Sequence, residues 1–203
     1  MRRFQTQHGH NFWQATMTDH RFGQSQLQAL RLIKSRRLSL IASTRELINK
    51  DLDGATVLAE ALGVAVPGDW PPPLYGRTAM RFVLMQLDDP AEQGWSFWYL
   101  INNSEPGELV GLCGFKGRPD ADGSVELSYS VIEKYQRQGF ATEAAAALVG
   151  WAFSRHNVKE VSAETFPYLR QSIRVLEKNG FKLTGAGSEA GVVRYAVTKD
   201  SLK

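Results

Sequence analysis

YQRQGFATEA, residues 135–144, is the stretch that decides the fold of this chain. It follows a strand-like run at 125–132 and opens a long apolar helical pattern. A strand, a glycine-containing turn and a helix in this order build an anion site, because the first N–H groups of a helix lack intrahelical partners and the helix dipole adds positive charge there. Gly139 lets a ligand approach the backbone, Ala141 keeps the next turn narrow, and Arg137 can add a charged contact. The stretch therefore predicts a phosphate or pyrophosphate site.

The spacing within this stretch narrows the class of phosphate ligand. The sequence contains neither the G-x-x-x-x-G-K-[ST] of a P-loop nor a G-x-G-x-x-G after a strand. Gln136-x-x-Gly139-x-Ala141 instead resembles the Q/R-x-x-G-x-G/A signature of the GNAT acyltransferases, which grips the pyrophosphate of acetyl-CoA. Two flanking blocks, 125–131 and 170–181, occur in the order of that family, and the second resembles its last helix with a Gly-Phe exit.

The resemblance implies a fold and a co-substrate. The fold is an α+β GNAT fold, a mixed and mostly antiparallel sheet with a β-splay and flanking helices. Acetyl-CoA is the implied co-substrate, and no metal is expected. The pantetheine arm is expected on backbone groups of Val131, Ile132 and Glu133, one N–H of which polarises the thioester carbonyl. The pyrophosphate is expected at Arg137, Gln138, Gly139, Phe140, Ala141 and Thr142.

Polar residues alternate with apolar ones along the strand that precedes the glycine-containing turn at Gly139, which we call the anion turn. Glu126, Ser128 and Ser130 share one face of this strand. One interpretation is an ordinary wet sheet face. The other places Glu126 in an acceptor cleft, where it takes a proton from an incoming ammonium, because an amine must lose its proton before it attacks a thioester. Glu164, on the next strand, is the alternative base.

Ser172 stands in the first turn of the last predicted helix. In the Rim-type branch, which contains the ribosomal-protein N-terminal acetyltransferases, a serine here lies near the CoA sulfur and can protonate the leaving thiolate. The alternative is a helix N-cap serine, and both roles are compatible. The branch usually has N-x-x-S, and Leu169 stands where the Asn is expected, so an Asn–CoA contact is not predicted. Tyr168 is a neighbouring, weaker acid candidate.

Length and charge divide the chain into two predicted parts. Residues 1–36 are expected to form a basic, loosely ordered extension, and residues 37–203 the GNAT domain. Seven Lys and Arg stand against one acidic residue in the first 40 residues, so the remainder of this +3 chain is net negative. An upstream translation start, a docking arm for an acidic partner or nucleic acid, and a transit peptide remain open for the extension.

Composition also bounds location and partners. The single cysteine, Cys113, cannot form an internal disulfide, and no Cys/His cluster has zinc spacing. No apolar run reaches the roughly 20 residues that a membrane span needs. We expect a cytoplasmic enzyme whose partner is an amine, either a small molecule or a protein N-terminus. Neither a membrane nor nucleic acid is expected as a partner of the catalytic domain, and a homodimer remains open. A non-catalytic acyl-CoA sensor or scaffold is the alternative function.

Apolar periodicity and turn residues predict the order of the elements. Strands are expected at 38–42, 95–101, 109–115, 125–132, 158–165, 181–184 and 192–197. Helices are expected after a cap at Ser43 or Thr44, and at 55–62, 77–87, 140–155 and 170–179.

Overall fold

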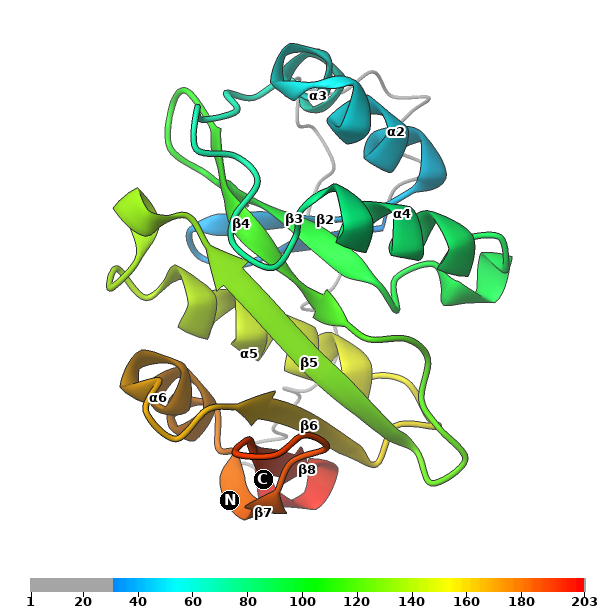
Figure 1. The fold of residues 1–203 in the computed structure, drawn as a ribbon, viewed down its shortest axis with the longest axis vertical. Coiled ribbons are helices and arrows are strands. Elements are labelled where there is room, and N and C mark those ends of the chain that lie inside the picture. Colours follow the sequence, from blue (N-terminus) through cyan, green and yellow to red (C-terminus); the bar gives the residue numbers. More distant parts are fainter. Residues whose placement is uncertain (1–30, 203) are drawn as a thin grey trace, which may run out of the picture.

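A single mixed sheet organises the chain, as seen in a computed structural model that describes residues 31–202 (Figure 1). Its eight strands are β1 (Leu32–Lys34), β2 (Leu38–Ala42), β3 (Phe97–Asn102), β4 (Glu108–Phe115), β5 (Ser124–Val131), β6 (Glu160–Thr165), β7 (Lys182–Ala186) and β8 (Val193–Thr198). They lie in the order β1-β2-β3-β4-β5-β6-β8-β7, and only β5 and β6 run parallel to each other. The expected mostly antiparallel GNAT sheet is confirmed.

Helices cover both faces of this sheet. One face carries α2 (Arg45–Asp53), α3 (Ala55–Leu62) and α4 (Arg77–Gln86), and the other carries α5 (Phe140–Phe153) and α6 (Arg170–Lys178) (Figure 1). Three 3₁₀ turns complete the described elements: η1 (Pro90–Glu92), η2 (Glu133–Tyr135) and η3 (Lys199–Leu202). None of the helices in the described part of the chain is long and apolar enough to cross a membrane.

Alternation along the central strands divides the interior into two cores. Leu40 and Trp98 join the core beneath α5 and α6, whereas Ile41 and Tyr99 join the core beneath α2, α3 and α4. All four side chains are at most 1% exposed. Because neighbouring residues of a strand point to opposite faces, a central strand with two buried faces reads as a continuous apolar run. This is why the aromatic residues of β3 form core rather than a wet surface.

The elements match the predicted order, with one addition at the start. Strand β1 pairs with β2 through Leu32↔Ile41 to Lys34↔Ser39, so the sheet begins before the expected domain boundary at residue 37. A strand of three residues is too short to show an alternation of apolar and polar residues, so β1 was assigned to the extension. Residues 1–30 of the expected extension lie outside the described residues, and the proposed division into two parts stays a prediction.

Two glycines, Gly114 and Gly150, differ in the space that a side chain would find. A Cβ on Gly114 of β4 would lie 2.3 Å from Ser96 O and 2.4 Å from Phe97 Cα, whereas one on Gly150 of α5 would meet nothing within 4 Å. We therefore expect Gly114→Ala to lower the free energy of unfolding by at least about 2 kcal/mol through overpacking. Gly150→Ala should raise it by about 0.5–1 kcal/mol, because Ala loses less backbone entropy in a helix. Urea denaturation of the two variants checks both signs, and a neutral Gly114→Ala would contradict the packing.

Candidate active site

The two parallel strands, β5 and β6, pair over only part of their length. Strands β5 and β6 are in register only from Ser124↔Glu160 to Glu126↔Ser162. Beyond these three pairs β5 continues to Val131 and β6 to Thr165 without pairing to each other. The sheet is thus split into two parts by a V-shaped opening, which is the predicted β-splay.

The ladder on the other side of β5 decides which backbone groups face this opening. Lys116 N donates to Glu126 O, and Ile132 N donates to Val110 O, so the even-numbered residues of β5 exchange their hydrogen bonds with β4. Residues opposite one another in an antiparallel pair alternate between hydrogen-bonded and non-hydrogen-bonded positions. The backbone groups of Tyr129 and Val131, which lie beyond the last pair with β6, are therefore directed toward the opening. The carbonyl of Val131 accepts a hydrogen bond from Gln136 Nε2 at 3.0 Å.

Helix α5 begins at a left-handed glycine beside the opening. Gly139 has φ +84° and is the N-cap of α5, and Arg137 also lies in the left-handed region at φ +59°. The first hydrogen bond of the helix runs from Glu143 N to Gly139 O, so the N–H groups of Phe140, Ala141 and Thr142 precede the helical ladder. A turn of this shape followed by free N–H groups suits an anion with several oxygen atoms.

Arg37, at the turn between β1 and β2, holds this anion turn in place. Its backbone N–H donates to Glu143 Oε1 at 2.6 Å, and its Nε donates to Glu143 Oε2 at 2.7 Å. Its Nη1 donates to the carbonyl of Gln138 at 2.8 Å, and its guanidinium lies 4.6 Å from the ring centre of Phe140. Ser35 Oγ adds a third hydrogen bond to the Glu143 carboxylate at 2.8 Å.

The hydrogen bonds from Arg37 and Ser35 to Glu143, which we call the clamp, set the charge state of Glu143. Partial burial alone would raise the pKa of Glu143, but the hydrogen bonds from the Arg37 side chain, the Arg37 backbone and Ser35 together hold that pKa below its ordinary value of 4.5. A carboxyl group with a lowered pKa contributes stability above its unfolded pKa and loses it as the pH falls through the folded value. The clamp is therefore fully formed at neutral pH.

Ser172 pairs with a tyrosine that the sequence analysis did not single out. Its Oγ lies 3.0 Å from Tyr129 Oη, which also donates to the Ser172 carbonyl at 3.1 Å. The N-cap of α6 is Leu169, so Ser172 is the third helical residue and the N-cap interpretation was wrong. Burial raises the pKa of Tyr129 to about 12, although the hydrogen bond with Ser172 opposes the rise. Tyr129 therefore keeps its proton at neutral pH.

The two candidate bases, Glu126 and Glu164, lie on the side of β5 opposite to Ser172. Glu126 Oε1 is 2.5 Å from Lys116 Nζ, and the Glu126 side chain is 25% exposed. Both oxygens of Glu164 are held by Ser188, whose N–H donates at 2.9 Å and whose Oγ donates at 2.6 Å. Glu164 thus anchors the connection between β7 and β8, whereas only one oxygen of Glu126 carries a described contact.

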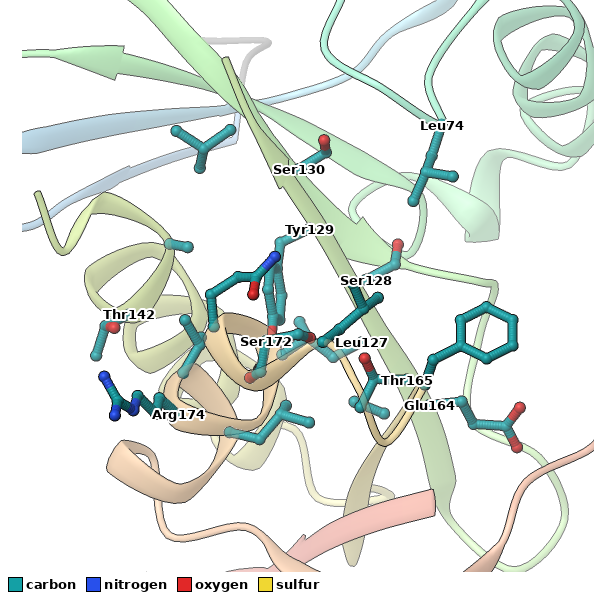
Figure 2. Close-up of a pocket in the computed structure, with 18 of the residues that line it drawn as sticks. Leu74, Leu127, Ser128, Tyr129, Ser130, Thr142, Glu164, Thr165, Ser172 and Arg174 are labelled. Carbon is teal, nitrogen blue, oxygen red and sulfur yellow. Dashed lines mark hydrogen bonds between the residues drawn. The ribbon is translucent and has the colours of Figure 1, made fainter. Parts of the chain in front are cut away.

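These elements enclose one cleft of about 1280 Å³ that passes through the splay. Figure 2 shows Leu74, Ser128 and Glu164 on one side of β5, and Thr142, Ser172 and Arg174 on the other. The anion turn lies on the second side, so a long ligand with a phosphate at one end can place its other end in the opening. An acceptor on the first side would reach that end without passing the phosphate site.

The family follows from comparison with known proteins. Residues 45–182 match the family model described as the acetyltransferase (GNAT) domain, which is more than half of the chain. The chain belongs to the GNAT acetyltransferase family. It is 30% identical over 128 residues to the uncharacterized N-acetyltransferase YjdG of Bacillus subtilis (strain 168), covering 63% of this chain and 76% of YjdG.

Solved structures agree with this GNAT assignment at the level of the fold. RimL, a ribosomal L7/L12 alpha-N-protein acetyltransferase in complex with coenzyme A, is 19% identical with a TM-score of 0.59 over 84% of this chain and 99% of that one. The ribosomal-protein-S5-alanine acetyltransferase of Vibrio fischeri is 15% identical with a TM-score of 0.59 over 85% and 99%. As a GNAT enzyme, the protein uses acetyl-CoA to acetylate an amine. Within residues 31–202, no group of His, Cys, Asp or Glu side chains is arranged to hold a metal ion.

The GNAT cleft contains most, but not all, of the residues expected to meet acetyl-CoA. Those that line it are Val131, Arg137, Gly139, Phe140, Ala141 and Thr142. Ile132 is 1% exposed and belongs to the interior, Glu133 begins the 3₁₀ turn η2, and Gln138 uses its carbonyl to bind Arg37. These three residues lie outside the cleft lining, and the roles of all nine residues in binding acetyl-CoA stay predictions.

Sequence reasoning missed Arg37 and Tyr129. Arg37 was counted only as one basic charge, and Tyr129 only as an apolar member of its strand. Their partners, Glu143 and Ser172, lie 106 and 43 residues away, so no local pattern indicated either contact.

Gly139 tests the anion turn. A residue with a side chain at this position would have to adopt φ +84°, and its Cβ would lie 3.2 Å from Arg37 Nη2. We expect Gly139→Val to lower CoA affinity at least about 100-fold, because it closes the approach to the helix N-terminus and shifts Arg37. Gly191, at φ +80° with nothing within 4 Å of its would-be Cβ, is the matched control for backbone strain. Calorimetric titration with CoA measures both variants, and full affinity in Gly139→Val would mean that the phosphates bind elsewhere.

Proposed function

We propose that the amine attacks acetyl-CoA directly in a ternary complex, with the acyl donor on the α5 side of the splay and the acceptor on the Glu126 side. The observation that carries this proposal is a cleft lined by residues from both sides of β5. Acetyl-CoA fits the donor side for three reasons: the left-handed turn at Gly139, the free N–H groups of α5, and the β5 backbone groups directed into the opening. When bound, acetyl-CoA supplies an activated thioester carbonyl.

A covalent acetyl-cysteine route has little support. Cys113 is the single cysteine of the chain, and it is fully buried in the core beneath α5. Burial raises the pKa of its thiol well above the ordinary value, so the nucleophilic thiolate is disfavoured. Direct attack by the amine needs no such intermediate.

In the proposed mechanism Glu126 accepts the proton that the ammonium must lose, directly or through water. Backbone N–H groups of β5 that face the opening polarise the carbonyl oxygen. The new C–N bond forms as the C–S bond breaks, and Ser172 gives its proton to the departing sulfur. The second proton, which the nitrogen loses as it becomes an amide, restores the Ser172 hydroxyl directly or through water. Tyr129 positions Ser172 for this step: its hydroxyl donates to the Ser172 carbonyl, and its oxygen lies 3.0 Å from Ser172 Oγ. Glu164 remains the alternative base.

The acceptor is a primary amine on a small molecule or at a protein N-terminus. The two similar ribosomal-protein acetyltransferases named above favour a protein α-amine only through a shared fold. A cytoplasmic location and a homodimer stay predictions. A non-catalytic acyl-CoA sensor or scaffold is not favoured for a chain of this family.

An assay for free thiol over a panel of peptides and small amines tests the proposed function. Amine-dependent release of CoA with intersecting initial-velocity lines is the expected result. Parallel lines would indicate a covalent acetyl-enzyme, and CoA binding without any transfer would favour the sensor.

Glu126→Gln tests the base. We expect kcat to fall by about 100-fold or more at neutral pH, the usual scale for a lost general base. The loss should shrink at high pH, where the acceptor is already a free amine. Lys116→Gln removes the ion pair but keeps the carboxylate, so it separates charge pairing from proton transfer. If Glu126→Gln stays active at every pH while Glu164→Gln does not, Glu164 is the base.

Ser172→Ala and Tyr129→Phe test the acid. Each should reduce kcat more than it weakens CoA binding, because the charge on sulfur exists mainly in the transition state. If the two hydroxyls act as a unit, the double variant should lose about as much as Ser172→Ala alone. Tyr168→Phe is the control, since Tyr168 is 71% exposed and stacks on Phe166. Normal kcat in Ser172→Ala would remove the acid role from this pair.

A further inference from the structure

Leu74 projects over the acceptor side of the cleft in an unusual conformation. It lines the cleft, is 84% exposed, and lies on the same side of β5 as Ser128 (Figure 2). Its φ of +75° is in the left-handed region, where a leucine is rare because its side chain crowds the backbone. Strained residues of this kind persist where their surroundings fix them, and they cluster at ligand clamps.

The next residue fixes Leu74 to the catalytic strand. Tyr75 is buried, its hydroxyl is 2.8 Å from Ser128 Oγ, and its ring meets Phe97 edge-on at 5.7 Å between centres. Its N–H donates to Pro72 O at 3.2 Å. The loop is thus attached to the polar row of β5 itself, two residues along the strand from Glu126.

A second apolar side chain lies at the end of the other strand of the splay. Phe166 directly follows β6, lines the same cleft and is 38% exposed. Its ring stacks on Tyr168 with 5.2 Å between centres and 17° between planes. The cleft is therefore lined by one exposed apolar side chain from the loop tethered to β5, Leu74, and by another at the end of β6, Phe166.

Three carboxylate side chains line the same cleft as Leu74 and Phe166: Glu126, Glu164 and Glu189. Among the cations of the lining, Lys116 is paired with Glu126, Arg137 belongs to the anion turn, and Arg170, Arg174 and Lys178 belong to α6. Carboxylates attract an ammonium group and repel an acidic one, whereas the apolar pair can bury an uncharged substituent.

We infer that the acceptor is a primary ammonium whose neighbouring carbon carries an apolar substituent about the size of a leucine or phenylalanine side chain. This inference rests on the proposed function and names the acceptor class for the same site. The ammonium lies at the glutamates and the substituent lies between Leu74 and Phe166. A peptide N-terminus and a small alkylamine or arylalkylamine share this chemistry.

Competition between matched acceptors tests the inference. The peptide arm uses Leu-Gly-Gly, Phe-Gly-Gly, Gly-Gly-Gly and Asp-Gly-Gly, and the small-molecule arm uses isopentylamine, phenethylamine and ethylamine. We expect kcat/KM to be about 10- to 100-fold higher for the apolar member of each pair, the usual range for an apolar group in a pocket. Asp-Gly-Gly should be the poorest peptide. The arm with the larger absolute kcat/KM identifies the source of the amine.

Two variants attach the preference to these residues. Leu74→Gly suits the left-handed backbone and removes the side chain, so it should reduce the Leu-to-Gly ratio of kcat/KM to about 3 or less without loss of folding. Phe166→Ala should reduce the same ratio independently. Leu183→Ala is the control, because Leu183 is 59% exposed on β7 and lies outside the cleft lining, so the ratio should stay at the wild-type value.

The outcomes separate this inference from the proposed function. Equal kcat/KM for apolar and glycine acceptors in the wild type, or a preference that survives both Leu74→Gly and Phe166→Ala, would overturn the inference while leaving acetyl transfer intact. No transfer to any amine in either arm would overturn both.

Discussion

The separation of β5 from β6 is the constraint on which the rest of the site depends. Two strands that pair over three residues and then diverge leave backbone groups of β5 directed into an opening instead of into a ladder. The Val131 carbonyl accepts a hydrogen bond from Gln136, and each remaining group forgoes roughly 1 kcal/mol of net hydrogen-bond stabilisation until a ligand supplies a partner. The opening also lets one cleft reach both faces of the sheet, so a donor and an acceptor can meet at β5 from opposite sides.

The anion turn is formed in advance by a distant part of the chain. Arg37 binds Glu143 through its side chain and its backbone, and it binds Gln138 through the same guanidinium. A turn that is already held in its binding conformation loses less entropy when a ligand arrives, which strengthens binding without a new contact. The tether from Tyr75 to Ser128 has the corresponding effect on the acceptor side. The donor side is therefore fixed from the turn between β1 and β2, and the acceptor side is fixed from β5.

Local patterns predicted the parts of this structure that depend on local physics. Strand β5, the anion turn and α5 could be predicted because a left-handed glycine, a helix N-terminus and an apolar period occur together within about 30 residues. The cap at Thr44 and the exit at Gly180 were legible for the same reason. Strand β1 was missed because it has three residues, and the pairing of Ser172 with Tyr129 was missed because the two residues lie on different elements. Long-range pairs leave no period in the sequence.

Amide hydrogen exchange with and without saturating CoA tests the central claim most directly. The account predicts slower exchange at the free N–H groups of Phe140, Ala141 and Thr142, and at the N–H groups of β5 that face the opening. Exchange in α2 and α3, which are remote from the donor side, should not change. Protection confined to other elements, or no change at the start of α5 while CoA is bound, would contradict the assignment of the donor site to the splay.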